Sequence, residues 1–255
     1  MAEEYRSNCR RNRHWRKSGK SREILPHGGS MYKKCALALM VLAVLAAPTL
    51  GSIRGNLTSE LEPDIIGKIN QTDMIITPAE ANLWLQERTL WQEHVFWTRM
   101  AITSILQNSA DRDPVINRLL RNDDDMSETI EPYYGNETAK RYGDLIEDHL
   151  LIAAALVSAV RDGNQTAIAS ANDMWYKNAD EIAEFESNLS ISLLPKDRKA
   201  MWREHLNLTK NETLQLANGD YNASIDTFDR IVEQGNMMAD SLAQGIIIQF
   251  PERFH

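Results

Sequence analysis

Two stretches decide the fold of this chain: WQEHVFWTR at residues 91–99 and WREHLNLTK at residues 202–210. In each, a tryptophan lies three residues before a histidine, a glutamate directly precedes that histidine, and a threonine followed by a base comes one helical turn later. A third acidic residue–histidine pair, Asp148-His149, lies midway, so that His94, His149 and His205 are separated by 55 and 56 residues. A fixed long period is typical of a repeated supersecondary unit, and we expect three copies.

Helix start and stop signals divide the chain after residue 76 into six segments. Thr77-Pro78-Ala79-Glu80 is a capping box with proline at the first helical position. Gly163 and Gly219 are predicted helix ends, and no stretch shows the alternation of a strand. The predicted helices cover about residues 78–107, 113–132, 137–161, 165–187, 195–218 and 221–247. Short loops between them predict an all-α helical bundle of about six helices, built as three tandem helical hairpins.

The charge of the chain separates a basic leader from an acidic body. Residues 1–34 hold ten Lys/Arg and three Glu, about +7, whereas the remainder carries about −15. A body this acidic excludes nucleic acid as the expected partner, because phosphate binding needs clustered positive charge.

A charge-free run from Cys35 to Ile53 follows Lys33-Lys34, and its apolar centre is too short to cross a bilayer comfortably. A basic start, a short apolar run and small residues near its end are typical of a signal peptide, with cleavage after Ala46 or Gly51. We therefore expect a leader and signal peptide at 1–51, a polar linker at 52–76 and a helical-bundle domain at 77–255. The alternative is an uncleaved anchor, in which case this segment alone would contact the membrane.

Export also agrees with the glycosylation sequons. Asn-x-Ser/Thr occurs eight times, and every copy lies after the apolar run. We expect an extracytoplasmic protein that is secreted or associated with the cell envelope; a polar surface without glycans is the alternative. The acceptors are Asn56, Asn70, Asn136, Asn164, Asn188, Asn207, Asn211 and Asn222.

The three histidines are candidate metal ligands. Each lies near the middle of its predicted helix on an apolar stripe, so all three are expected to point inward at one level of the bundle. Three imidazoles can hold a divalent metal ion or a small polar ligand. The alternative is that each histidine is a core residue that hydrogen-bonds one neighbour, such as the mid-helix Asn122, Asn178 or Asn236.

Carboxylates near the histidines divide into two groups. Glu93, Asp148 and Glu204 are adjacent in sequence and therefore lie about 100° round the helix, as flanking residues. Glu87 and Glu212 are seven residues from His94 and His205, on the same helix faces. Together with Asn122 and Asn178, these two are the candidate residues for contacting a bound ligand.

The sequence lacks the motifs of several other kinds of functional site. The two cysteines, Cys9 and Cys35, both lie in the leader, so the mature chain is expected to have no disulfide and no thiolate ligand. There is no glycine-rich phosphate loop, no Gly-x-Ser-x-Gly, and neither of the sequence patterns of ferritin-like or hemerythrin-like metal sites. An enzyme is thus the least favoured class, after a ligand-binding protein and a structural or interaction glycoprotein of the cell envelope. Protein partners are not indicated.

Several short motifs carry a resemblance to a known family: Trp91-x-x-His94, Asp148-His149-Leu150, His205-Leu206-x-Leu208-Thr209 and Gln249-Phe250-Pro251, together with RLLRN at 118–122 and WYKNADEI at 175–182. Over residues 82–254 the chain resembles a family of exported all-helical proteins of bacilli and methanogenic archaea. The resemblance implies export and the helical fold, and no particular activity.

The leader gives the first testable prediction. Met31 begins an ordinary signal peptide, and residues 1–30 have no targeting pattern. N-terminal sequencing of the unprocessed natural protein should therefore start at residue 31, and that of the mature protein shortly after residue 46 or 51. A mature protein that still carried residues before Met31 would contradict this prediction.

Overall fold

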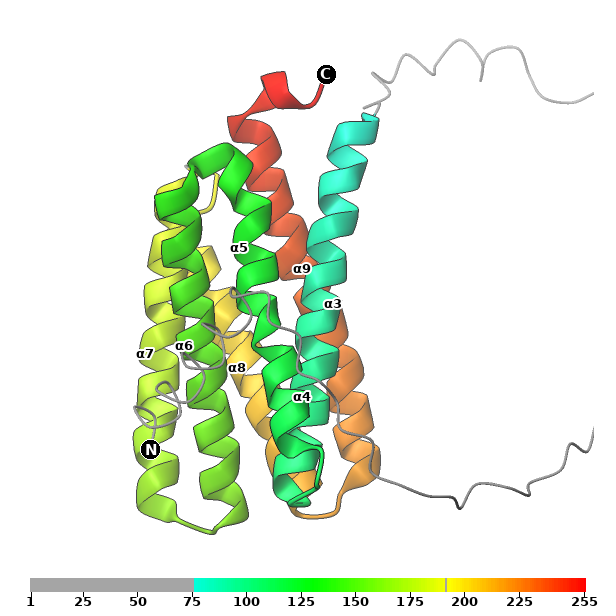
Figure 1. The fold of residues 1–255 in the computed structure, drawn as a ribbon, viewed down its shortest axis with the longest axis vertical. Coiled ribbons are helices and arrows are strands. Elements are labelled where there is room, and N and C mark those ends of the chain that lie inside the picture. Colours follow the sequence, from blue (N-terminus) through cyan, green and yellow to red (C-terminus); the bar gives the residue numbers. More distant parts are fainter. Residues whose placement is uncertain (1–75, 191) are drawn as a thin grey trace, which may run out of the picture. The chain divides into compact units, whose positions relative to one another are not determined.

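The computed structural model describes residues 76–190 and 192–255, and these residues are helical and contain no strand, as the sequence predicts. The predicted leader, signal peptide and linker lie outside this range. Figure 1 shows the bundle with its helices side by side along a common axis. The α-helices are α3 (Pro78–Leu106), α4 (Arg112–Leu119), α5 (Arg121–Tyr134), α6 (Asn136–Arg161), α7 (Gln165–Leu189), α8 (Pro195–Ala217) and α9 (Tyr221–Gln249), followed by the 3-10 turn η1 (Pro251–Arg253).

The local sequence signals explain where the helices begin and end. The predicted capping box at α3 is present, because the Thr77 hydroxyl accepts from the Glu80 backbone N–H and the Glu80 carboxylate accepts from that of Thr77. The side chains of Asn164 and Asp220 cap α7 and α9 by accepting a hydrogen bond from the backbone N–H three residues later. Gly163 and Gly219 follow α6 and α8 with φ of +64° and +77°, the left-handed backbone region that glycine adopts most readily because it has no Cβ.

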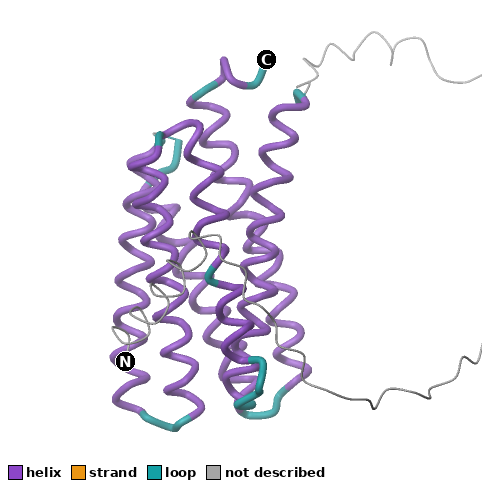
Figure 2. The backbone as a smooth tube through the Cα atoms, viewed as in Figure 1, coloured by secondary structure: helices purple, strands orange, loops and turns teal. Residues whose placement is uncertain are grey.

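The helices form three antiparallel pairs that close into a ring. α3 packs against α4 and α5, α6 against α7, and α8 against α9, while α9 also packs along α3. Within each pair the first helix, α3, α6 or α8, also contacts the first helices of the other pairs. Figure 2 shows the short loops that reverse the chain within each pair. The arrangement places one side of α3, α6 and α8 along the axis of the bundle.

One predicted helix is interrupted. The segment expected as a single helix at 113–132 is α4 followed by α5, with the break at Leu120. Leu120 keeps a right-handed helical conformation, and its backbone N–H still donates to the Ile116 carbonyl at 2.9 Å. The break is therefore local, and both parts remain packed on α3.

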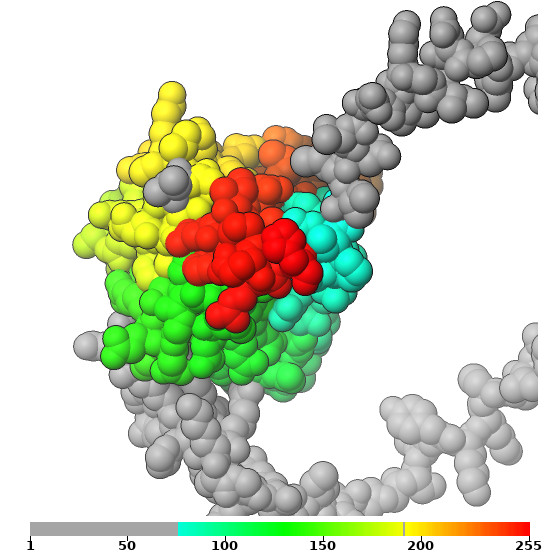
Figure 3. Space-filling model, turned by 90° about the horizontal axis from the view of Figure 1, so that it is seen from above, coloured from blue at the N-terminus to red at the C-terminus, as the bar shows by residue number. Residues whose placement is uncertain are grey.

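Aromatic residues close one end of the bundle. Phe254, only 3% exposed, stacks on Tyr133 with a ring-centroid distance of 5.8 Å, and Phe250 contacts Tyr133 at 5.6 Å. Seen from above in Figure 3, the red C-terminal residues lie over this end, next to the cyan start of α3. The Gln249-Phe250-Pro251 motif thus ends α9 and directs the last aromatic side chain back onto α5.

Of the helices that the structure describes, none combines the length and the apolar character that crossing a membrane requires.

Candidate metal centre

The three histidines predicted to meet do so in the core of the bundle. His94 comes from α3, His149 from α6 and His205 from α8, and each is 1% exposed. Their nearest candidate ligand atoms lie within 4.8 Å of one another, and their ring centroids are 5.5–6.3 Å apart. The long period in the sequence therefore predicts both the helices and their common level correctly.

A side-chain amide holds each ring from the second helix of the same pair. The amide oxygens of Asn122, Asn178 and Gln234 lie 2.8, 2.9 and 3.1 Å from Nδ1 of His94, His149 and His205, respectively. Each amide also donates its NH2 to the backbone carbonyl one turn before the histidine, at 3.0–3.1 Å, the acceptors being Leu90, Leu145 and Met201. The same two-bond contact thus occurs in all three helix pairs.

This contact determines the chemical state of the imidazoles. Because the NH2 group is engaged by a backbone carbonyl, the amide presents its oxygen, an acceptor, to the ring. Nδ1 must then carry the hydrogen, and Nε2 keeps its lone pair. Metal-bound histidines are oriented in the same way, with the non-ligating N–H donated to an oxygen.

The third amide corrects one prediction. Asn236 was expected to be the equivalent of Asn122 and Asn178, but it is only half-buried, and its amide oxygen accepts from Gln92 at 3.3 Å. Gln234 takes the position, because a glutamine carries the same amide and lies 29 residues after its histidine, as Asn178 does. The signal in the sequence is therefore a side-chain amide at a fixed spacing from the histidine, whether asparagine or glutamine.

Three tryptophans surround the histidines. The centroid of the Trp91 ring lies 5.3 Å from that of His94 and 5.7 Å from that of His205, and the Trp202 and His149 ring centroids are 5.2 Å apart. Trp175 donates its indole N–H to Nε2 of His149 at 3.2 Å, which the sequence did not reveal. Its position on α7, one turn before Asn178, is the signal that could have identified it.

Burial keeps the imidazoles neutral. Desolvation lowers the pKa of His94 to about 4 and that of His205 to about 3, with mutual repulsion adding to the effect at His205. The pKa of His149 is also well below its ordinary value, first through burial and then through the other two histidines. Neutral imidazole is the form that binds metal.

The donor set fits a transition metal. Zinc–nitrogen bonds of about 2.0–2.1 Å in tetrahedral geometry place nitrogens about 3.3 Å apart, so the present spacing requires the rings to close by about 1.5 Å at most. Three imidazole ligands with one remaining position are typical of catalytic or ligand-binding zinc, copper and iron sites. In the described part of the chain the cluster contains no carboxylate.

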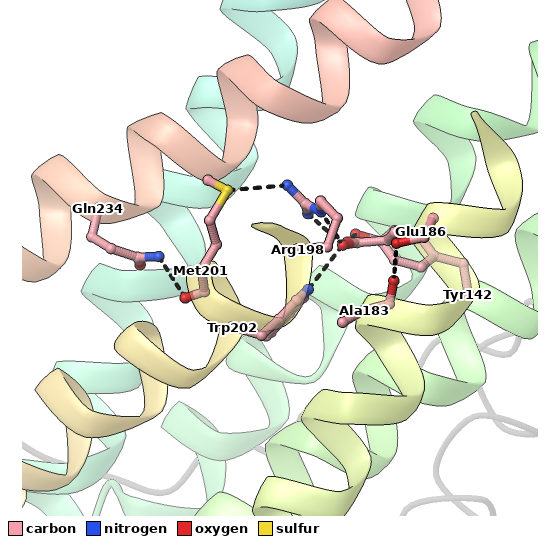
Figure 4. Close-up of polar contacts among 8 residues, drawn as sticks. Tyr142, Ala183, Glu186, Arg198, Met201, Trp202 and Gln234 are labelled. Atoms are coloured by element: carbon pink, nitrogen blue, oxygen red, sulfur yellow. Dashed lines mark hydrogen bonds and ion pairs between the residues drawn. The ribbon is translucent and has the colours of Figure 1, made fainter. Parts of the chain in front are cut away.

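A second buried polar cluster lies beyond the tryptophans, and Figure 4 shows it in close-up. Oε2 of Glu186 accepts from Nε of Arg198 at 2.7 Å and from the indole N–H of Trp202 at 2.9 Å, while Oε1 accepts from the Tyr142 hydroxyl at 3.3 Å. Glu186 and Arg198 are at most 1% exposed. Trp202 therefore joins this ion pair to the histidines.

Glu87 belongs to this second level and not to the histidine cluster. It is fully buried, and among the described residues neither of its oxygens has a hydrogen-bond partner. Burial raises its pKa to about 7, and Glu186 adds to this; Thr129 and Arg198 act in the opposite direction. The Thr129 hydroxyl itself donates to the Met126 carbonyl at 2.8 Å, so it leaves Glu87 without a full hydrogen bond.

Glu87, Tyr142 and Arg198 occupy equivalent positions, because each lies seven residues before one of the three histidines. All three are buried. The 55- and 56-residue spacing therefore continues one level further along the bundle, with unlike side chains at equivalent positions.

The other predicted carboxylates lie elsewhere. Glu212 forms an ion pair with Arg99, and its pKa is nevertheless raised to about 7 because burial outweighs the pairing. Glu93 pairs with Arg118 at 2.7 Å and Glu204 with Arg230 at 3.5 Å, both as partly exposed flanking residues. Glu87 and Glu212, which were predicted to contact a bound ligand, therefore lie at other levels of the bundle than the imidazoles. Asn122 and Asn178 do lie at the site, hydrogen-bonded to the rings.

Comparison with known proteins gives no further guidance. No family model matches the chain, and no curated protein and no solved structure matches it either. The resemblance to exported helical proteins stays a prediction.

The histidines predict an acid-sensitive fold. In the metal-free protein, burial lowers the folded pKa of His205 to about 3 from its ordinary 6.5, so between these two values only the unfolded chain takes up the proton. Stability from this group is complete above pH 6.5 and is lost as the pH falls towards 3. In urea unfolding between pH 4 and 6, His205→Gln should reduce the slope of stability against pH by up to about 1.4 kcal/mol per pH unit. A slope in His205→Gln equal to that of the wild type would contradict the buried neutral state of His205.

Glu87 predicts the opposite pH dependence. Its folded pKa of about 7 exceeds the ordinary 4.5, so between these values the folded state keeps a proton that the unfolded chain has lost. Its contribution to stability therefore declines as the pH rises through this window. Glu87→Gln should remove the decline and raise the free energy of unfolding at pH 8 by about 2 kcal/mol. Substitution of the exposed Glu184 by Gln should change it by less than about 0.5 kcal/mol; a destabilised Glu87→Gln at pH 8 would show that the ionised carboxylate is satisfied.

Proposed function

We propose that this protein binds a divalent transition-metal ion at His94, His149 and His205. The observation that supports this proposal is the meeting of three buried imidazoles, whose candidate ligand atoms lie within 4.8 Å of one another. The amide contact at each Nδ1 leaves Nε2 as the unprotonated nitrogen. A histidine that serves only as packing makes the same amide contact, but packing alone does not require three imidazoles at one level of the core.

The surroundings favour binding over catalysis. Three buried carboxyl groups of the described residues are accounted for in this way: Glu186 and Glu212 pair with arginine, and Glu87 lies at another level of the bundle. A hydrolytic metal site needs a general base within hydrogen-bond reach of the metal-bound water. The proposed role is therefore to hold a metal or to present it to a small ligand.

One observation favours a second candidate function. The Trp175 indole N–H occupies Nε2 of His149 at 3.2 Å, so this ring has hydrogen-bond partners on both nitrogens without any metal. A structural role for the histidines, in a cell-envelope interaction protein, follows if that bond persists. Metal binding requires Trp175 to give up this contact.

The proposed location is outside the cytoplasm. Its support is the basic leader, the short apolar run and the placement of the sequons. In the described part of the chain the acceptor asparagines are exposed: Asn136, Asn164, Asn188, Asn207, Asn211 and Asn222. Glycan attachment at these positions agrees with the fold and stays a prediction.

Elemental analysis of the natively purified protein tests the metal site. We expect one zinc, copper or iron per chain, lost in His149→Ala and unchanged in His255→Ala, which removes an exposed histidine. Asn178→Leu keeps the ligands but removes the hydrogen bond to Nδ1, so metal affinity should fall about 10–100-fold.

The same variants separate the two candidate functions. A metal-free native protein that takes up no added metal, with His149→Ala merely less stable, would establish the structural role. Trp175→Phe provides a further check, because it frees Nε2 of His149. It should strengthen metal binding if the ring is a ligand, and it should only weaken the fold if the ring is a packing residue.

A further inference from the structure

A divalent ion at the histidine cluster brings two positive charges into a buried site that lacks a counter-charge. The three imidazoles are neutral, and in the described part of the chain no carboxylate belongs to the cluster. The buried Glu186–Arg198 pair at the next level carries no net charge. An uncompensated charge in a protein interior is costly. Metal binding therefore favours any change that places a negative charge close to the site.

Glu87 is a buried group that can make this change. Neither of its carboxyl oxygens has a hydrogen-bond partner among the described residues, and burial without donors favours the protonated form. Glu87 precedes His94 by seven residues on α3, which separates the two by about 10.5 Å along the helix. Over such a distance in a protein interior, the attraction between a divalent ion and a carboxylate is strong enough to shift a protonation equilibrium.

Other helices surround Glu87 with few charges. The polar groups that act on it are Thr129 and Tyr133 of α5, Tyr142 of α6, Glu186 of α7 and Arg198 of α8. On α9, Asp240 pairs with Arg88 at the surface. Arg198 is the cation that faces Glu87, and Glu186 already engages two of its nitrogens. The carboxyl group of Glu87 therefore stays uncharged until a further positive charge enters the core.

The ionised form of Glu87 nevertheless has donors nearby. The indole N–H of Trp91 is buried without a partner, and Trp91 lies one helical turn after Glu87 on the same face of α3. Figure 4 shows that the remaining terminal nitrogen of Arg198 points at the Met201 sulfur, a weak acceptor 3.7 Å away. Both donors can turn to a carboxylate, so the surroundings of Glu87 suit the protonated and the ionised state.

We propose that Glu87 is the counter-charge of the metal at the histidine cluster: its carboxyl group is protonated in the metal-free protein and gives this proton to solvent when a divalent ion binds. The proposal rests on the proposed function and adds a coupling between metal affinity and pH. Because each bound ion releases a proton, affinity rises with pH and becomes constant once Glu87 is ionised in the metal-free protein as well.

Glu212 is the rival source of the proton. It follows His205 by seven residues, so it lies about as far from the cluster as Glu87, towards the other end of the bundle. It is 1% exposed, but it pairs with Arg99, which already balances its charge. The variants Glu87→Gln and Glu212→Gln therefore distinguish an unpaired carboxyl group from a paired one.

Calorimetric titration of the metal-free protein with zinc chloride, in two buffers of different ionisation enthalpy, counts the protons released. At pH 6.5 the histidines contribute almost none, because the pKa of His94 is about 4 and that of His205 about 3. The wild type should release about 0.5 to 1 proton more per zinc than Glu87→Gln. A proton lost from zinc-bound water is common to both proteins and cancels. Glu184→Gln, which changes an exposed carboxylate on α7, should match the wild type.

Zinc affinity, measured by competition with a coloured chelator, gives a second readout. At pH 8 Glu87→Gln should bind zinc about 10–100-fold more weakly than the wild type, because the counter-charge is missing. At pH 5 the difference should shrink, since Glu87 then tends to keep its proton with zinc bound. An affinity ratio that does not change with pH overturns the proposal.

Infrared difference spectra of the wild type provide a test that needs no variant to fold. Addition of zinc at pH 6.5 should remove a C=O stretching band of a protonated carboxylic acid, and Glu212→Gln should still show this loss. The proposal is overturned if Glu87→Gln releases as many protons as the wild type, or if the loss disappears in Glu212→Gln instead. Either result leaves zinc binding by the histidines intact, whereas a chain that binds no zinc refutes the proposed function together with the counter-charge.

Discussion

The contact on which the structure depends is the side-chain amide that bonds twice to the neighbouring helix. In each helix pair it accepts from the histidine ring and donates to the carbonyl one turn earlier. Both groups are buried, so breaking either bond leaves a polar atom without water, at a cost of about 1–3 kcal/mol. The contact therefore sets the register of each pair as well as the orientation of its imidazole.

Most of the fold follows from local signals in the sequence. Thr77, Gly163 and Gly219 mark helix boundaries because each satisfies a backbone requirement that depends on few neighbours. The break at Leu120 has no such signal, since leucine there keeps helical dihedral angles. The predicted pairing of helices is confirmed because short loops leave antiparallel packing as the simple solution.

The site could be predicted in part. The spacing of the histidines predicts their meeting, since equivalent positions on equivalent helices lie at one level. The sequence predicted Asn236 in place of Gln234, because asparagine occupies the equivalent position in the other two pairs and glutamine carries the same amide on a longer side chain. The Glu186–Arg198 pair was missed for a different reason: charged residues on a helix are usually solvated, and only the packed structure shows that neither is more than 1% exposed.

The tryptophans at the cluster have a practical consequence. Trp91, Trp175 and Trp202 all lie against the histidines, and the contact from Trp175 is a hydrogen bond. Indole emission responds to nearby ions and to the loss of a hydrogen bond, so the fluorescence of these residues would report binding of the proposed metal. Occupancy of the proposed site could thus be followed by intrinsic tryptophan fluorescence, without a label or a modified chain.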